Sequence, residues 1–213
     1  MKQHIETVQE EIANSITHGV GALLSVSAMS ILVVLAYQRG DPWRMVSFSI
    51  YGATLVIMYL SSTFYHAFPF SGVKRVFKIL DHAAIFLLIA GSYTPFCLVT
   101  LRGAWGWSIF GVVWGIALFG IVFKAIFPVR FRFTTTVLYL FMGLIIVIAV
   151  KPLLANLPRG GLTWIAMGGA SYVCGIAFYL WDSLPFSHTV WHLFVLGGSA
   201  LHFFGILFYV LPM

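Results

Sequence analysis

Long, continuous apolar runs constrain this chain more than any other feature of its sequence. Seven such runs recur along the 213 residues with few charges inside them, and each is close to the roughly 20 residues that a helix needs to cross the bilayer core. Strands of a transmembrane barrel would instead alternate apolar and polar residues over about 10 positions. The sequence therefore predicts an all-α membrane protein with seven transmembrane helices. We place these helices at about residues 17–37, 45–68, 79–101, 104–123, 133–150, 160–181 and 187–211.

Composition agrees with this fold class and defines the domain organisation. Hydrophobic residues make up 61% of the chain and charged residues only 8%, and the mean hydropathy is +0.98, far above the range of globular proteins. Nothing remains for a soluble domain, so we expect one transmembrane domain over residues 1–213. Residues 1–16 differ, because apolar residues recur there at helical spacing among three glutamates. This pattern predicts an interfacial amphipathic segment before the first span.

Basic residues predict the orientation, since cytoplasmic loops are enriched in lysine and arginine. The N-terminal segment and the even-numbered loops hold seven of the twelve basic residues, and the opposite face holds five. We therefore expect a cytoplasmic N-terminus and an external C-terminus. The net charge of +6 fits attraction to anionic lipid headgroups, and no nucleic-acid partner is needed to explain it. The seven residues are Lys2, Lys74, Arg75, Lys78, Lys124, Arg130 and Arg132, and the five are Arg39, Arg44, Arg102, Lys151 and Arg159.

Polar side chains gather at one end of the predicted bundle. Strict alternation of seven spans fixes which helix ends share a face, whatever the absolute orientation. An ionisable residue in a membrane span is costly, so it is by default a candidate for function. The polar residues that meet at the predicted cytoplasmic end are Glu11, Asn14, His18, Ser62, His66, Asp81, His82, Asp182, His188 and His192.

Two of these histidines have the spacing of metal ligands. His188 and His192 are four residues apart, which puts both rings on one face of a helix. A third imidazole from His66 would complete a zinc site with one position left for water. Asp81 could orient that water or take its proton. The hydroxyl of Ser62, one turn before His66, could hydrogen-bond the water or a developing oxyanion.

Other polar residues have simpler explanations. A single histidine in a membrane span more often forms a hydrogen bond between helices than it binds a metal. This explanation suits His202, which lies roughly 15 Å beyond His192 along the helix and cannot share its metal. Three residues of the first span are open to two interpretations, as capping groups at a helix start or as support for the metal ligands: Glu11, Asn14 and His18.

Four segments carry a resemblance that covers essentially the whole chain. They are EEIANSITHGVG at residues 10–21, SSTFYH at 61–66, LDHAAIFLLIAGSYTPF at 80–96 and SHTVWHLFVLGGSALHF at 187–203. With these motifs the chain resembles the hemolysin III family, the bacterial branch of the progestin and adipoQ receptor (PAQR) family. The resemblance implies seven transmembrane helices with a cytoplasmic N-terminus, and a multi-pass protein of the bacterial inner (plasma) membrane.

The resemblance also implies a cofactor and an activity. It implies that His66, His188 and His192 hold Zn²⁺, and that Asp81 and Ser62 are associated with the zinc-bound water. The family is grouped with alkaline ceramidases among membrane lipid hydrolases. A ceramidase-like hydrolase of lipid amides or esters is therefore expected, with a membrane lipid or fatty acyl chain as substrate or ligand and a role in membrane lipid homeostasis.

Two alternatives from other functional classes stay open. A non-catalytic, zinc-stabilised membrane sensor or receptor-like protein would carry the same ligands, and the sequence does not distinguish it from an active hydrolase. A pore-forming hemolysin would need a continuous polar stripe on several helices. Polarity is instead concentrated at one end of the predicted spans, which favours the first two possibilities over the pore.

Overall fold

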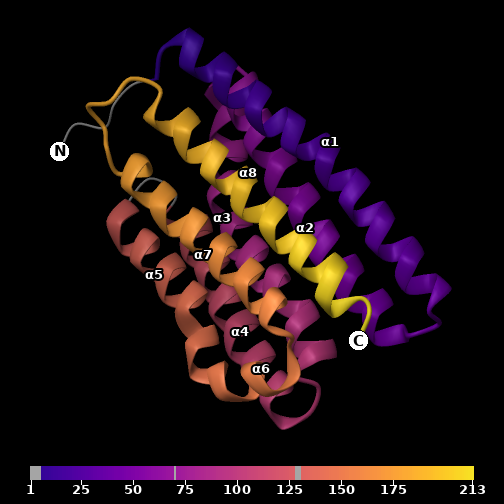
Figure 1. Ribbon diagram of the computed structural model, residues 1–213. Coiled ribbons are helices and arrows are strands. Elements are labelled where there is room, and N and C mark those ends of the chain that lie inside the picture. Colours follow the sequence, from indigo (N-terminus) through magenta and orange to yellow (C-terminus); the bar gives the residue numbers. More distant parts are fainter. Residues whose placement is uncertain (1–5, 70, 128–130) are drawn as a thin grey trace.

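The computed structural model describes residues 6–69, 71–127 and 131–213. These residues form a bundle of helices (Figure 1). The α-helices are α1 (Val8–Gln38), α2 (Pro42–Ala67), α3 (Ser71–Pro95), α4 (Ala104–Ile126), α5 (Arg132–Leu144), α6 (Val150–Asn156), α7 (Arg159–Tyr179) and α8 (Ser187–Gly205). A π-helical turn, Phe96–Thr100, follows α3, a 3₁₀ turn, Ile145–Ala149, joins α5 to α6, and a second π-helical turn, Ile206–Val210, follows α8.

Within the described residues, seven helical segments are long and apolar enough to cross a membrane. The fifth of them runs over Arg132–Asn156 and consists of α5, the 3₁₀ turn and α6. The all-α fold with seven membrane-spanning helices is thus confirmed, and the chain is a multi-pass membrane protein. The cytoplasmic location of the N-terminus stays a prediction, and two of the basic residues behind it, Lys2 and Arg130, lie outside the described residues.

The first helix begins earlier than its apolar run. Thr7 caps α1, since its backbone N–H donates to the Glu10 carboxylate at 2.7 Å and its hydroxyl accepts from the Glu10 N–H at 3.3 Å. This reciprocal capping box starts the helix at Val8. Residues 8–16, within the interfacial segment expected over residues 1–16, are the first turns of α1 and continue into the span without a break. Residues 1–5 lie outside the described part, and the interfacial location of the segment stays a prediction.

The third helix also extends beyond its apolar run, because it begins at Ser71 and carries Lys74 and Lys78 on its first turns. At its other end Pro95 lacks a backbone N–H, and the wide π-helical turn of Phe96–Thr100 follows directly. Hydropathy therefore located the apolar part of these two helices, whereas each helix extends beyond that part at its N-terminal end.

The second and third spans form the interior of the bundle. In the most apolar stretch of each span, 78% of the residues are buried in the third span and 56% in the second, against 28% in the first. The first helix lies along α2 and α8 on the outside of the bundle (Figure 1). The starts of α1, α3 and α8 and the end of α2 lie together at one end of the bundle (Figure 1). This end holds the candidate site.

Candidate metal centre

Three histidines from two helices meet at this end of the bundle. His66 is in the last turn of α2, and His188 and His192 are in the first two turns of α8. One nitrogen from each ring lies within 4.8 Å of the other two. The ring centroids are 5.1 Å apart for His66 and His188, 5.2 Å for His66 and His192, and 4.6 Å for the α8 pair. The side chains that the sequence singled out as zinc ligands therefore converge.

A carboxylate of α1 fixes the orientation of the His66 ring. Nδ1 of His66 lies 2.7 Å from Oε2 of Glu11. An ionised carboxylate only accepts hydrogen bonds, so the Nδ1–H donates and Nε2 keeps its lone pair. The other carboxylate oxygen of Glu11 accepts from the Lys74 ammonium at 2.5 Å. Carboxylate–histidine pairs of this kind set the tautomer and orientation of metal-binding histidines.

Two ring nitrogens in this cluster are buried without a hydrogen-bond partner in the described part of the chain. They are Nε2 of His66 and Nδ1 of His192, and the two residues are only 4% and 1% exposed. An unsatisfied buried polar atom in a native protein calls for an explanation, and an ion is one of the usual ones. Three imidazoles with free lone pairs suit zinc as a donor set. The residues present therefore fit this metal.

Glu6 joins the cluster from the segment before α1, a position that no sequence pattern predicts. Its carboxylate lies 3.4 Å from Nδ1 of His66 and 3.5 Å from Nδ1 of His188. Burial raises the pKa of the Glu6 carboxyl, but the hydrogen bond with His66 and the attraction to His188 outweigh burial and lower the pKa to about 2. Glu6, Glu11 and His66 also form a second group whose potential ligand atoms lie within 4.8 Å of one another.

The first helix places two more of the singled-out residues behind the α8 histidines. The Asn14 carboxamide oxygen accepts from the Thr189 hydroxyl at 2.5 Å and so ties α1 to the start of α8. The His18 ring stacks on His192, with centroids 3.5 Å apart and planes 11° from parallel. The Tyr59 ring is perpendicular to the His18 ring, with centroids 5.0 Å apart. Asn14 therefore contacts α8, and His18 contacts a candidate ligand. Their role in supporting the metal ligands stays a prediction.

Asp81 and Ser62 lie close to the histidines in the buried interior. Asp81 is 8% exposed, lines the cavity described below, and interacts electrostatically with His66 and His188. Ser62 is completely buried. Its hydroxyl lies near the Asp81 carboxylate, although it forms no hydrogen bond of normal geometry within the described residues. The positions are compatible with the catalytic roles expected of both residues, which remain predictions.

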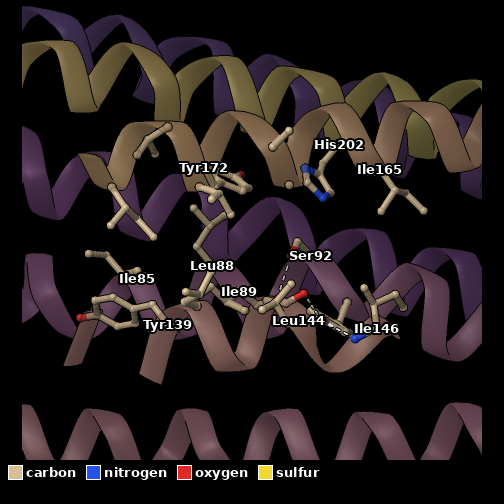
Figure 2. Close-up of a pocket in the computed structure, with 18 of the residues that line it drawn as sticks. Ile85, Leu88, Ile89, Ser92, Tyr139, Leu144, Ile146, Ile165, Tyr172 and His202 are labelled. Atoms are coloured by element: carbon tan, nitrogen blue, oxygen red, sulfur yellow. Dashed lines mark hydrogen bonds between the residues drawn. The ribbon is translucent and has the colours of Figure 1, made fainter. Parts of the chain in front are cut away.

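A large cavity leads from the histidines into the apolar interior. Its volume is about 550 Å³, and Asp81, His188 and His192 line one end of it. Most of its walls come from α3, α5, the 3₁₀ turn, α6, α7 and α8, with one residue each from α1, α2 and the π-helical turn after α3. Figure 2 shows Leu88 and Ile89 between Tyr172 on one side and Leu144 on the other. A smaller cavity of about 310 Å³ lies on the other side of His188, and its lining is rich in charged residues: Glu6, Glu10, Glu11, Lys74, Lys78, Arg132 and Asp182.

Seven transmembrane helices, a cluster of three histidines of which two are buried, and an apolar cavity beside it define a polytopic membrane protein with a candidate metal centre. Comparison with known proteins identifies the family. The profile of the family described as Haemolysin-III related matches residues 6–203. The chain belongs to this hemolysin III family, within the progestin and adipoQ receptor (PAQR) family, and the multi-pass fold is consistent with a bacterial cell membrane.

The relatives match along nearly the whole chain. Hemolysin-3 of Bacillus cereus is 49% identical over 212 residues, which cover 100% of this chain and 97% of that protein. The Hemolysin-3 homolog of Bacillus subtilis (strain 168) is 48% identical and covers 95% of each chain. The human Monocyte to macrophage differentiation factor is 28% identical over 94% of this chain and 84% of its own. No solved structure matches.

Proposed function

We propose that this protein is a zinc-dependent hydrolase of lipid amides or esters that acts in membrane lipid homeostasis. The observation that carries the proposal is the position of the histidine cluster, which lies at the end of an apolar cavity of about 550 Å³. An apolar pocket with a few convergent polar groups is the usual form of a site for a hydrophobic ligand. The cavity would hold the acyl chain, and the bond to be cleaved would lie among the polar residues at its end.

His66, His188 and His192 would hold the metal. Zinc bound there would supply an acidified water and polarise the substrate carbonyl. Glu11 would hold the His66 ring in the orientation that leaves Nε2 free. The stack of His18 on His192 would restrict rotation of the second ligand ring.

Two remaining polar side chains would transfer the proton and stabilise the developing negative charge. Asp81 lies on the cavity wall, so its carboxylate would accept a proton from the attacking water and return it to the leaving group. The buried hydroxyl of Ser62 would donate a hydrogen bond to the developing oxyanion. The apolar walls of the cavity would keep bulk water from the reacting bond, which strengthens each of these interactions.

A non-catalytic sensor is the second candidate, and one observation favours it. Through Glu11, His66 and Lys74, the cluster already connects α1, α2 and α3, so a metal added to it would brace several helices without any turnover. A pore is less well supported, because the cavity lining beyond the histidine end is largely apolar within the described residues.

The test combines metal content with turnover. The detergent-purified wild type is expected to contain about one zinc per chain by plasma mass spectrometry, and His66→Ala, His188→Ala and His192→Ala should each lose it. Lipid amides and esters would then be screened for zinc-dependent cleavage. Zinc with cleavage supports the hydrolase, and zinc without cleavage of any lipid supports the sensor. Protein purified without chelators and free of metal would rule out both.

A further inference from the structure

The far end of the cavity carries a polar side chain that the metal centre does not use. His202 of α8 is 8% exposed and lines the same cavity as His192. Ten residues of helix separate the two, about 15 Å at 1.5 Å per residue, so His202 cannot contact the cluster. Figure 2 shows its ring pointing into the cavity, on the same side as Tyr172 and opposite Ile146.

The hydrogen bond that His202 makes determines what its free nitrogen can do. Nδ1 lies 2.8 Å from the carbonyl oxygen of Gly198. A carbonyl only accepts, so the Nδ1–H donates, and Nε2 of the neutral ring is an acceptor. A charged imidazole in such apolar surroundings would be costly. Within the described ranges, no hydrogen bond to Nε2 is found.

The His202 ring is held in place by its neighbours. It stacks on Tyr172, with ring centroids 5.5 Å apart and planes 25° from parallel. The Tyr172 hydroxyl is in turn hydrogen-bonded to the Ser199 hydroxyl at 3.0 Å. On the adjacent helix, Gly168 leaves room for the ring, since a Cβ there would overlap it. The acceptor therefore has a fixed position before any ligand arrives.

Other polar groups at this end of the cavity already have partners. The Ser92 hydroxyl donates to the Ile89 carbonyl at 2.8 Å. The Tyr93 hydroxyl lies 2.8 Å from the carbonyl oxygen of Met142 and accepts from the Ile146 N–H at 3.0 Å. The hydroxyl hydrogens of Ser92 and Tyr93 are thus engaged within the protein, and the acceptors that remain on this part of the cavity wall in the described residues include the Ser92 oxygen and Nε2 of His202.

We propose that His202 is a specificity-determining residue, whose Nε2 accepts a hydrogen bond from a hydroxyl near the far end of a bound lipid chain. The cavity would then select hydroxylated acyl chains over plain ones of equal length. A plain chain leaves Nε2 desolvated and unpaired, and sites built around a hydrogen bond discriminate against ligands that lack it. The inference rests on the proposed function in one respect, namely that the cavity holds an acyl chain with its polar head at the histidines.

The test measures binding to the full-length, zinc-loaded protein in lipid nanodiscs. The probes are palmitic acid and ω-hydroxypalmitic acid, together with shorter and longer pairs of the same kind. At one chain length we expect the hydroxylated member to bind about 3- to 10-fold more tightly, the ratio that one net hydrogen bond gives. The preference should fall for shorter and longer pairs, because the hydroxyl then misses Nε2.

His202→Phe keeps an aromatic ring without the acceptor, so both members of each pair should bind it equally, and its zinc content should stay unchanged. His202→Gln, which restores an acceptor oxygen, should recover part of the preference. Equal binding of the two probes to the wild type at every length would overturn this inference alone, and that measurement needs no variant. A preference that persists in His202→Phe would also overturn it. Failure of both probes to bind the wild type at every chain length would overturn the acyl-chain cavity, and the inference with it.

Discussion

Glu11 on α1 and His66 on α2 form a carboxylate–histidine pair, with Oε2 of Glu11 2.7 Å from Nδ1 of His66. The pair leaves the other ring nitrogen of His66 buried without a partner in the described chain. An outer helix therefore sets the tautomer of a candidate ligand on an inner one.

Removing the charge of Glu11 should weaken zinc binding without removing a ligand. In Glu11→Gln we expect zinc affinity to fall by about 10- to 100-fold, the usual effect of losing a partner that orients a ligand. The measurement is competition with a chelator of known affinity. Asp41→Asn is the control, because Asp41 caps α2 at the opposite end of the bundle. Equal affinity in Glu11→Gln and Asp41→Asn would show that the pair does not support a metal.

Asp81→Asn should separate metal binding from turnover. Because Asp81 is expected to move a proton and not to hold the metal, the variant should keep its zinc and lose about 10²- to 10⁴-fold in lipid cleavage. Metal analysis would check the zinc content, and single-turnover assays would check the rate of lipid cleavage. His66→Ala is the comparison, since it should lose zinc and activity together. Full activity in Asp81→Asn would remove this residue from the mechanism.

Two glycines of α4 offer a matched test of helix packing. A Cβ at Gly120 would overlap the Phe86 ring of α3, whereas a Cβ at Gly115 would meet nothing within 4 Å. Gly120→Ala should therefore destabilise the fold by about 1–3 kcal/mol through overpacking. Gly115→Ala should be neutral or slightly stabilising, because alanine favours the helix. Thermal unfolding followed by fluorescence-detected size exclusion would compare the two, and similar midpoints would contradict the α3–α4 packing.

Loss of the cap on α1 should loosen the first turns of that helix. Thr7→Ala removes the hydroxyl that accepts from the Glu10 N–H, which typically costs about 1 kcal/mol. Hydrogen exchange in the first two turns should be faster in this variant. In the control Thr17→Ala, the lost hydroxyl only bonds the Ala13 carbonyl within the same helix, and exchange at the start of α1 should not change. Unchanged exchange in Thr7→Ala would show that the cap does not define the start of the helix.

The spans and the meeting of the three histidines were predictable because both follow from hydropathy, alternation and helical spacing. The apolar run marked the first span only from about residue 17, whereas α1 begins at Val8. The helical spacing of apolar residues before the run, and the capping-box spacing of Thr7 and Glu10, are the local signals of this earlier start. Hydropathy indicates which part of a helix is apolar enough to lie in lipid, whereas the hydrogen bonds of the first turn determine where the helix begins.

The contacts of Glu6 and the cavity could not be predicted in the same way. Glu6 reaches His66 and His188, which are far away in sequence, and no periodicity links them. The cavity depends on where side chains of nine helical segments leave space, which only packing determines. His202 illustrates the difference, since its position in a span was evident from the sequence, but the direction of its ring was not.

The uninterrupted first helix has a mechanical consequence. α1 contains 31 residues and is therefore about 46 Å long, against about 30 Å for the hydrocarbon core, so it must tilt or project from the bilayer. Lipid borders most of it, since only 28% of its apolar window is buried. A thinner or thicker bilayer changes the tilt of such a helix, and Glu11 moves with it as part of one rigid rod. The partner of the His66 ring is thus carried on the same uninterrupted helix that borders the lipid.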